Sequence, residues 1–173
     1  MVMIRPLSDA DIDPVAEVHV RTWRSAYAGI IPADYLASLD PVQFARRRRT
    51  FPVPPGAATL VADDDGAIVG FATFGPARLA QGSEYDQTNG ELYAIYVDPD
   101  HQGAGTGRRL LAAARAALKA AGFPRMWLWV LAENHPSRRF YEHMGMTADG
   151  TTHVYTPRGT SAKLPEVRYA VEL

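Results

Sequence analysis

The sequence of 173 residues contains no cysteine, which excludes disulfides, thiolate nucleophiles and every metal site with a cysteine ligand. It has no run approaching the ~20 apolar residues that a membrane span needs, and its first residues lack the layout of a signal peptide. Neither sign of charge is in excess, because 18 Lys and Arg are balanced by 19 Asp and Glu, which gives a net charge of -1. No overall field would attract nucleic acid or an anionic membrane. We therefore expect a cytoplasmic protein that meets charged partners only locally.

The composition is that of an ordinary globular protein, with 47% hydrophobic and 21% charged residues. The length matches the usual size of one folding unit, and neither an internal repeat nor a linker-like stretch is present. The sequence therefore predicts a single domain over residues 1–173, with one active site.

Periodicity and breaker residues predict several helices before the first long strands. A short strand over residues 2–5 precedes a helix that begins after Ser8 and ends near Tyr27, and Pro32 and Pro41 each open a shorter helix. Two strands over residues 59–62 and 67–74 then form a hairpin, and the polar residues 75–90 predict a long loop.

The second half of the sequence alternates strands and helices. Residues 92–97 are apolar on both faces and predict a central strand. The mixed order predicts an α+β fold, a largely antiparallel sheet with helices on both sides. The remaining elements are helices over 106–121 and 135–144 and strands over 126–131, 153–155 and 167–173.

A glycine-rich segment, residues 102–107, lies between a predicted strand and a predicted helix. In that position backbone N–H groups and the helix dipole favour an anion. Its glycines stand at every second position, which matches neither the dinucleotide fingerprint nor the P-loop. Arg108 and Arg109 in the first helical turn oppose the dipole, so a bound anion would explain them. An ordinary glycine-rich turn remains the alternative.

Two motifs together resemble the GNAT superfamily of acyl-CoA-dependent N-acetyltransferases. The first family motif has Arg or Gln, two residues, Gly, one residue, then Gly or Ala, after a strand that ends in Val. The second has Asn, two residues, Ala, two residues, Phe-Tyr, three residues, then Gly-Phe, and here Ser137 replaces Ala and Met146 replaces Phe. The order of elements also fits, so the resemblance covers nearly the whole chain. The matching residues are Val97, Gln102, Gly105 and Gly107 for the first motif, and Asn134, Phe140, Tyr141 and Gly145 for the second.

The resemblance implies a twisted, mostly antiparallel sheet of about six or seven strands, splayed in the middle and flanked by helices on both faces. It implies acetyl-CoA as the acyl donor and no metal. Main-chain groups of Ile95 and Val97 would bond the pantetheine arm as an added strand, and the glycine loop would wrap the pyrophosphate. The implied cofactor-binding residues are Ile95, Tyr96, Val97, Gln102, Gly103, Ala104, Gly105, Thr106, Gly107, Arg108, Asn134, Ser137 and Tyr141.

Two side chains are suitable for the chemistry of acetyl transfer to an amine. By resemblance, Tyr141 lies near the thioester sulfur and donates its phenolic proton as general acid; the alternative is a core tyrosine. Glu91 precedes Val97 on the same strand, where some family members carry a glutamate that takes the amine's proton, directly or through water. Its alternative is a solvated carboxylate at a strand end. The N–H of Val97 could stabilise the developing oxyanion.

The acceptor site is less specified. Trp23 and Tyr27 lie with His19 on one stripe of the first helix, which suits either a core face or, by resemblance, the acceptor cleft. Tyr93 is a further candidate for the substrate site. Three more residues, of which the acidic pair would suit a cationic amine, are Arg78, Glu84 and Asp86.

The predicted function is therefore an N-acetyltransferase in which a bound amine attacks acetyl-CoA directly, without a covalent enzyme intermediate. The acceptor is a small-molecule amine or a peptide N-terminus. A domain that binds acyl-CoA without transferring the group, as a sensor, is the alternative. The arginines at 46–49 raise nucleic-acid binding as a third hypothesis, although consecutive residues on a helix point in all directions, and a solvated face is favoured. The histidines show no metal-ligand pattern, and the final strands could pair in a homodimer.

Overall fold

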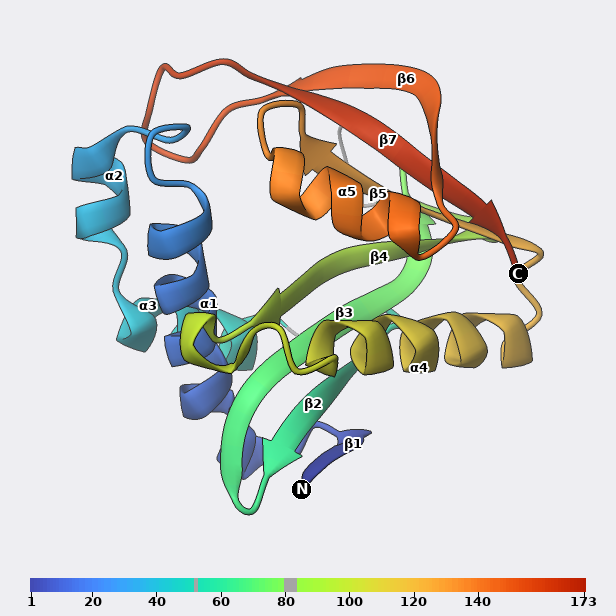
Figure 1. Cartoon of the computed structure of the whole chain (residues 1–173), viewed down its shortest axis with the longest axis horizontal. Helices are drawn as coiled ribbons and strands as arrows, with labels where there is room; N and C mark the ends of the chain where they lie inside the picture. The colour runs from blue at the N-terminus through green and yellow to red at the C-terminus, as the bar shows by residue number, and fades with distance from the viewer. Residues whose placement is uncertain (52, 80–83) are drawn as a thin grey trace.

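A computed structural model describes residues 1–51, 53–79 and 84–173 of the chain. Its centre is one seven-stranded sheet with the order β1-β2-β3-β4-β5-β7-β6 (Figure 1). The strands are β1 Val2–Pro6, β2 Ala58–Asp64, β3 Ala67–Arg78, β4 Tyr85–Val97, β5 Arg125–Leu131, β6 Thr147–Tyr155 and β7 Leu164–Glu172. The α-helices are α1 Ile12–Ala26, α2 Ala33–Ser38, α3 Pro41–Thr50, α4 Thr106–Ala120 and α5 His135–His143, with short 3-10 turns at Asp9–Asp11 and Pro99–His101.

The predicted α+β fold is confirmed. Every neighbouring pair of strands is antiparallel except β4 and β5, which run parallel. The doubly apolar strand β4 is the central one of the seven, as its sequence predicted. None of the helices in the described part of the chain is long and apolar enough to cross a membrane.

The long loop predicted over residues 75–90 is wrong for most of its length. Strand β3 continues to Arg78 and β4 already begins at Tyr85, with a register shift between Pro76 and Ala77. The polar side chains that suggested a loop lie partly on the exposed side of this two-stranded extension, where they remain in contact with water. Residues 80–83 of the predicted loop lie outside the described residues.

The helical segment begins after Ser8, as predicted, but its first turn is the 3-10 turn Asp9–Asp11 and α1 itself begins at Ile12. The backbone N–H and the hydroxyl of Ser8 both donate to the Asp11 carboxylate at 2.7 Å, and Arg5 donates to its two oxygens at 2.7 and 2.9 Å. These bonds supply a partner for the Ser8 N–H, which lies before the first hydrogen bonds of the helix. They also tie the start of α1 to strand β1.

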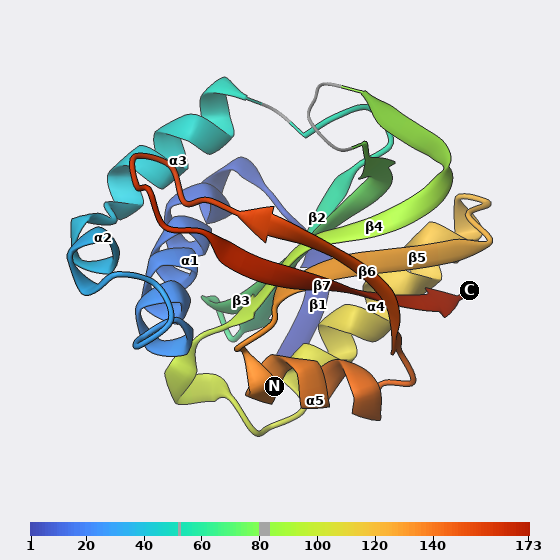
Figure 2. The ribbon, with the colours of Figure 1, turned by 90° about the horizontal axis from the view of Figure 1, so that it is seen from above.

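The two faces of the sheet carry different helices. Phe71 and Ala72 are adjacent on β3, so their side chains point to opposite faces. Phe71 packs against Val15 and Val18 of α1, whereas Ala72 belongs to the cluster that buries α4 and α5. Figure 2 shows α4 and α5 together on the opposite side of the strands from α1.

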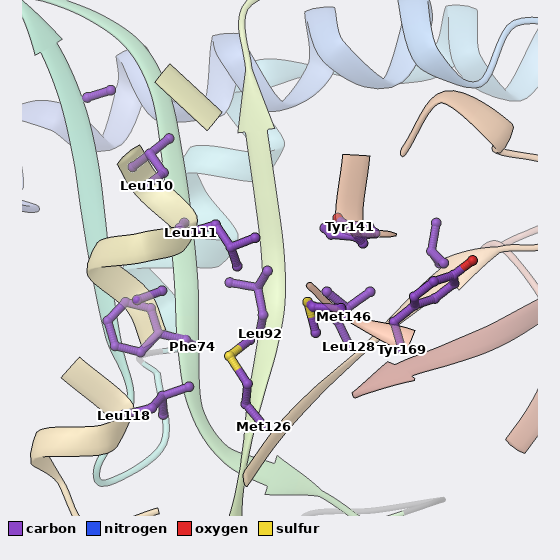
Figure 3. Close-up of a cluster of buried hydrophobic side chains, with 14 of the residues drawn as sticks. Phe74, Leu92, Leu110, Leu111, Leu118, Met126, Leu128, Tyr141, Met146 and Tyr169 are labelled. Atoms are coloured by element: carbon purple, nitrogen blue, oxygen red, sulfur yellow. The ribbon is translucent and has the colours of Figure 1, made fainter. Parts of the chain in front are cut away.

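The larger core cluster joins α4 and α5 across the central strand. Leu110, Leu111 and Leu118 of α4 are almost fully buried, which stabilises the fold by about 1.5–3 kcal/mol for each side chain. Figure 3 shows them on one side of Leu92, with Tyr141 and other α5-side residues on the other. This cluster fixes both helices at the place where β4 and β5 separate.

Candidate active site

A cleft of about 930 Å³ opens where β4 and β5 diverge. The two strands pair only at Gly90 with Met126 and at Glu91 with Trp127, and from there to Val97 strand β4 is paired with β3 but not with β5 (Figure 1). Among the residues predicted to bind the cofactor, Ala104, on the exposed loop, does not line the cleft. The lining includes Trp23, Tyr27, Glu91, Tyr93, Ile95, Tyr96, Val97, Gln102, Gly103, Gly105, Thr106, Gly107, Arg108, Asn134, Ser137 and Tyr141.

The end of β4 turns main-chain groups toward this cleft, although the carbonyl oxygen of Val97 already accepts hydrogen bonds from Gln102 and Thr22. The N–H of Asp98 bonds the carbonyl oxygen of Val69 at 2.8 Å, and the register pairs Tyr96 with Phe71. Hydrogen-bonded and open positions alternate along an antiparallel pair, so the backbone groups of Ile95 and Val97 point away from β3. No described strand occupies that side, so an extended ligand could bond there as a strand does.

The glycine loop presents free N–H groups at the start of α4. Gly103 and Gly105 both have φ of 83°, a backbone region that glycine adopts without a steric cost. The first helical bond runs from the N–H of Arg109 to the carbonyl oxygen of Gly105 at 3.1 Å. The N–H groups of residues 106–108 therefore precede the helical pairing and remain available to a ligand at the positive end of the helix dipole.

Buried polar contacts hold this loop in place. Asp98 accepts hydrogen bonds from the N–H of Asp100 at 2.9 Å, and its carboxylate pairs with Arg21 at 2.7 Å. Gln102 donates from Nε2 to the carbonyl oxygen of Val97 at 3.0 Å, so its side chain ties the loop to the end of β4. The expectation for Arg109 is wrong, because its guanidinium donates to the carbonyl oxygen of Val2 at 2.7 Å, and of the two loop arginines only Arg108 lines the cleft.

Helix α5 forms the opposite wall. Asn134 caps it by accepting a hydrogen bond from the N–H of Ser137 at 3.3 Å, which satisfies one free donor of the first turn. Tyr141 is almost buried, and burial raises the pKa of its phenol well above the usual range. Its hydroxyl has no hydrogen-bond partner among the described residues, although the residue lines the cleft. A protonated phenol with a free O–H is suited to donate a proton.

Glu91 is not the solvated carboxylate that was the alternative expectation. Its side chain is 0% exposed, and Arg78 bonds both of its oxygens. The backbone N–H of Arg78 reaches Oε1 at 3.1 Å, while Nε and Nη2 reach Oε2, Nε at 2.8 Å. The same guanidinium lies over the ring of Tyr93, whose hydroxyl donates to the carbonyl oxygen of Pro76. Both sequence candidates on this strand are therefore held by neighbours.

Aromatic rings of α1 and β4 form the floor of the cleft. His19 stacks on Tyr96 with centroids 5.0 Å apart, and Trp23 meets Tyr27 edge-on at 5.1 Å. Burial, helped by the charges of two nearby arginines, lowers the pKa of His19 to about 3. This stripe packs into the protein and also lines the cleft, so both expectations for it describe part of the arrangement.

Residues 19–146 match the family described as the Acetyltransferase (GNAT) family. The chain belongs to the GNAT acetyltransferases. It is 40% identical over 142 residues to "Uncharacterized N-acetyltransferase YuaI" of Bacillus subtilis, which covers 82% of this chain and 78% of that protein. It is 32% identical over 113 residues to the mycothiol acetyltransferase of Nocardiopsis dassonvillei, but this match covers 65% of this chain and only 34% of that longer protein.

Solved structures confirm the fold of this GNAT chain. The PaiA N-acetyltransferase of Thermoplasma acidophilum, crystallised in complex with coenzyme A, superposes with a TM-score of 0.74 at 20% identity. The match covers 100% of this chain and 99% of that one. The predicted central sheet, splayed in the middle and flanked by helices on both faces, is thus the GNAT architecture.

Four residues that the sequence did not single out also line the GNAT cleft. They come from β5, β6 and β7, and two of them, His153 and Glu166, face each other in the strand register. Only the pairing of β6 with β7 brings them together, so no spacing in the sequence could indicate it. The four residues are Trp129, His153, Tyr155 and Glu166.

Two acidic candidates lie elsewhere. Glu84 is exposed, and Asp86 binds the side chains of Thr88 and Asn89; neither residue lines the cleft. Both fall at the start of the extended β4, beyond the point where it meets β5.

The arginine run of α3 does not form one basic face. Arg48 lies over the ring of Phe71, with its guanidinium carbon 5.3 Å from the centroid, and Arg49 pairs with Asp13 at 2.9 Å. Within residues 1–51, 53–79 and 84–173, no three His, Cys, Asp or Glu side chains come together as metal ligands.

Proposed function

We propose that this GNAT enzyme moves the acetyl group of acetyl-CoA to a primary amine by direct attack within a ternary complex. The observation that carries the proposal is a single cleft that joins an unpaired strand edge, free N–H groups at a helix start and a buried tyrosine hydroxyl. Coenzyme A has parts that match these features: an extended pantetheine arm, a pyrophosphate and a sulfur that must leave with a proton. The solved coenzyme A complex of a protein with the same fold supports this choice.

The chain's own residues would hold this donor at both ends. The N–H groups of residues 106–108 and the Arg108 side chain bind the pyrophosphate. The main-chain groups of Ile95 and Val97 bond the pantetheine arm, and Asn134 and Ser137 line its other side. When bound, the donor supplies the activated thioester.

Tyr141 acts as the general acid in this scheme. The leaving thiolate needs a proton, and the Tyr141 phenol keeps its proton at neutral pH because burial raises its pKa. The N–H of Val97 stabilises the oxyanion that forms on the thioester carbonyl. The resemblance assigns the amine's proton to Glu91, directly or through a water, but this is the weaker assignment because Arg78 already bonds both oxygens of that carboxylate.

The test is the substitution Tyr141→Phe, which removes the hydroxyl and keeps the ring. We expect thiol release from acetyl-CoA, in the presence of an amine panel, to fall about 10²- to 10⁴-fold, as typical for loss of a general acid. The affinity for coenzyme A, measured by calorimetry, should change little.

A matched control is Tyr35→Phe, because Tyr35 lies on α2 outside the cleft. This variant should keep full activity. Normal turnover in Tyr141→Phe would show that another group protonates the thiolate. Tight coenzyme A binding without thiol release for any amine would favour the binding-only domain.

The acceptor is a small-molecule amine or a peptide N-terminus, and the whole chain works as one domain. A homodimer through β6 is also part of the proposal, because β6 is an edge strand of the sheet and its side chains are mostly exposed. Light scattering during size-exclusion chromatography tests the dimer, and one cooperative urea transition tests the single domain.

A further inference from the structure

Glu166 is an acidic residue of the cleft that the reaction scheme above does not use. It lies on β7, opposite Leu131 of β5 and His153 of β6 in the strand register. Its side chain is only 15% exposed, and Oε2 meets Nε2 of His153 at 2.5 Å. His153 is 43% exposed and lies against the ring of Trp129, with ring centroids 3.8 Å apart and the ring planes tilted by 38°. The carboxylate thus has one partner, and this partner reaches solvent.

The two carboxylates of the cleft differ in what their oxygens bind. Both oxygens of Glu91 accept hydrogen bonds from Arg78. Oε1 of Glu166 accepts no hydrogen bond within the described parts of the chain. It is also not among the fully buried polar atoms that lack a partner. Glu166 can therefore accept an N–H from a ligand without losing an existing bond.

The Arg78 guanidinium near Glu166 is already engaged by another carboxylate. Arg78 and Glu91 neutralise each other as an ion pair. Burial raises the pKa of Tyr27, Tyr96 and Tyr155, so these phenols are neutral, and the Glu166 charge adds to the shift in each. Burial also raises the pKa of Glu166, against the opposing effects of His153 and Arg78. The titratable and charged groups around it are Tyr27 from α1, Arg78 from β3, Glu91 and Tyr96 from β4, Tyr141 from α5, and His153 and Tyr155 from β6.

We propose that the Glu166 carboxylate, held by His153, binds the ammonium group of a monocationic primary amine and accepts its proton before attack. The proposal rests on the acetyl transfer proposed above and names the substrate class and base of the same site. Aromatic rings on both sides of the cleft, from Trp23 and Tyr27 to Trp129, suit a cation carried on a flat or apolar body.

The step is a proton transfer that balances. One N–H bond of the ammonium breaks, its proton moves to Glu166, and the His153 imidazole passes it to solvent. The neutral amine attacks the thioester carbon, so that a C–N bond forms and the C–S bond breaks, and Tyr141 gives its proton to the departing sulfur. The second proton of the amine nitrogen restores the Tyr141 phenol. One proton leaves in each turnover, as the overall reaction requires.

Phenethylamine and phenylalanine, supplied with acetyl-CoA, test the substrate class because they differ by one carboxylate. We expect kcat/KM to be at least about tenfold higher for phenethylamine, since Glu166 repels a second carboxylate near the amine. Equal or better use of phenylalanine would overturn the assigned substrate class.

The substitution Glu166→Gln tests the role of the side chain while keeping its shape. We expect kcat/KM for phenethylamine to fall about 10²-fold and the rising limb of its pH profile to disappear, with coenzyme A affinity and the urea midpoint unchanged. His153→Gln should shift that limb with a smaller loss, because it removes the path to solvent and the imidazole contact but keeps the Glu166 carboxylate. The control Glu172→Gln changes a glutamate of the same strand that is 82% exposed, and it should keep the wild-type profile.

Three outcomes separate failure of this inference from failure of acetyl transfer. An unchanged pH profile in Glu166→Gln, with amine-dependent thiol release intact, overturns the assignment of Glu166 alone. Loss of the limb in Glu91→Gln instead assigns the proton to Glu91. If no amine releases thiol, the proposed function fails. Calorimetric titration of the coenzyme A complex with phenethylamine then tests separately whether Glu166 binds the ammonium group. Binding about tenfold weaker in Glu166→Gln then supports an ammonium site, and equal binding removes it.

Discussion

Alanine at two nearby glycines should change stability in opposite directions. Gly105 caps α4 with φ of 83°, and a Cβ added there meets nothing within 4 Å, so the cost of Gly105→Ala is purely conformational. A left-handed residue with a side chain costs about 1–2 kcal/mol. Gly107 lies within α4, where a Cβ would meet Phe140 and Val97 at ordinary distances of 3.5 and 3.7 Å. Gly107→Ala should therefore gain up to about 1 kcal/mol of helix propensity.

Urea unfolding of the ligand-free protein measures this difference. With an m-value of about 2 kcal/mol/M, the midpoint should fall by about 0.5–1 M in Gly105→Ala and rise by up to about 0.5 M in Gly107→Ala. Gly103→Ala should behave like Gly105→Ala, because its φ is also 83°. If Gly107→Ala destabilises as much as Gly105→Ala, the start of α4 and its free N–H groups are not where the structure places them.

Two further predictions concern buried charge. Arg78→Leu leaves the buried Glu91 carboxylate with only a backbone donor, so the free energy of unfolding measured in urea should fall by about 3 kcal/mol. Adding Glu91→Gln should restore much of that loss, and a loss below about 1 kcal/mol in the single variant would contradict a buried pair. The lowered pKa of His19 means that the unfolded chain binds more protons, so stability should fall as the pH drops from about 6.5 towards 3, by up to about 1.4 kcal/mol per pH unit. His19→Phe should flatten that slope in urea titrations at several pH values, and an equal slope would place the proton elsewhere.

The sequence predicted those parts of the site that depend on local backbone structure. The glycine spacing of residues 103–107 and the helix that follows are set by neighbours in the chain, and Asn134 caps α5 through a residue three positions on. Their positions in the cleft follow from the strand that precedes each helix. Such short-range features can be read from one sequence.

The remaining parts of the site depend on contacts between distant strands. The extension of β3 and β4 carries polar residues and a bulge, so it looked like a loop. A solvated carboxylate was one of two alternatives for Glu91, but Arg78 on the neighbouring strand allows it to be buried. His153 meets Glu166 only through the register of β6 and β7, which shifts between Ala148 and Thr152. Register of this kind is set by the whole sheet, and a single sequence does not state it.

The most direct test of direct acetyl transfer is the initial rate of thiol release, measured while acetyl-CoA and phenethylamine are both varied. Attack within a ternary complex predicts that no thiol is released without amine and that the double-reciprocal lines intersect. Parallel lines, together with an acetylated enzyme in the intact mass spectrum, would indicate a covalent intermediate and contradict the mechanism. Absence of amine-dependent thiol release across a broad amine panel would contradict the assignment as an active N-acetyltransferase.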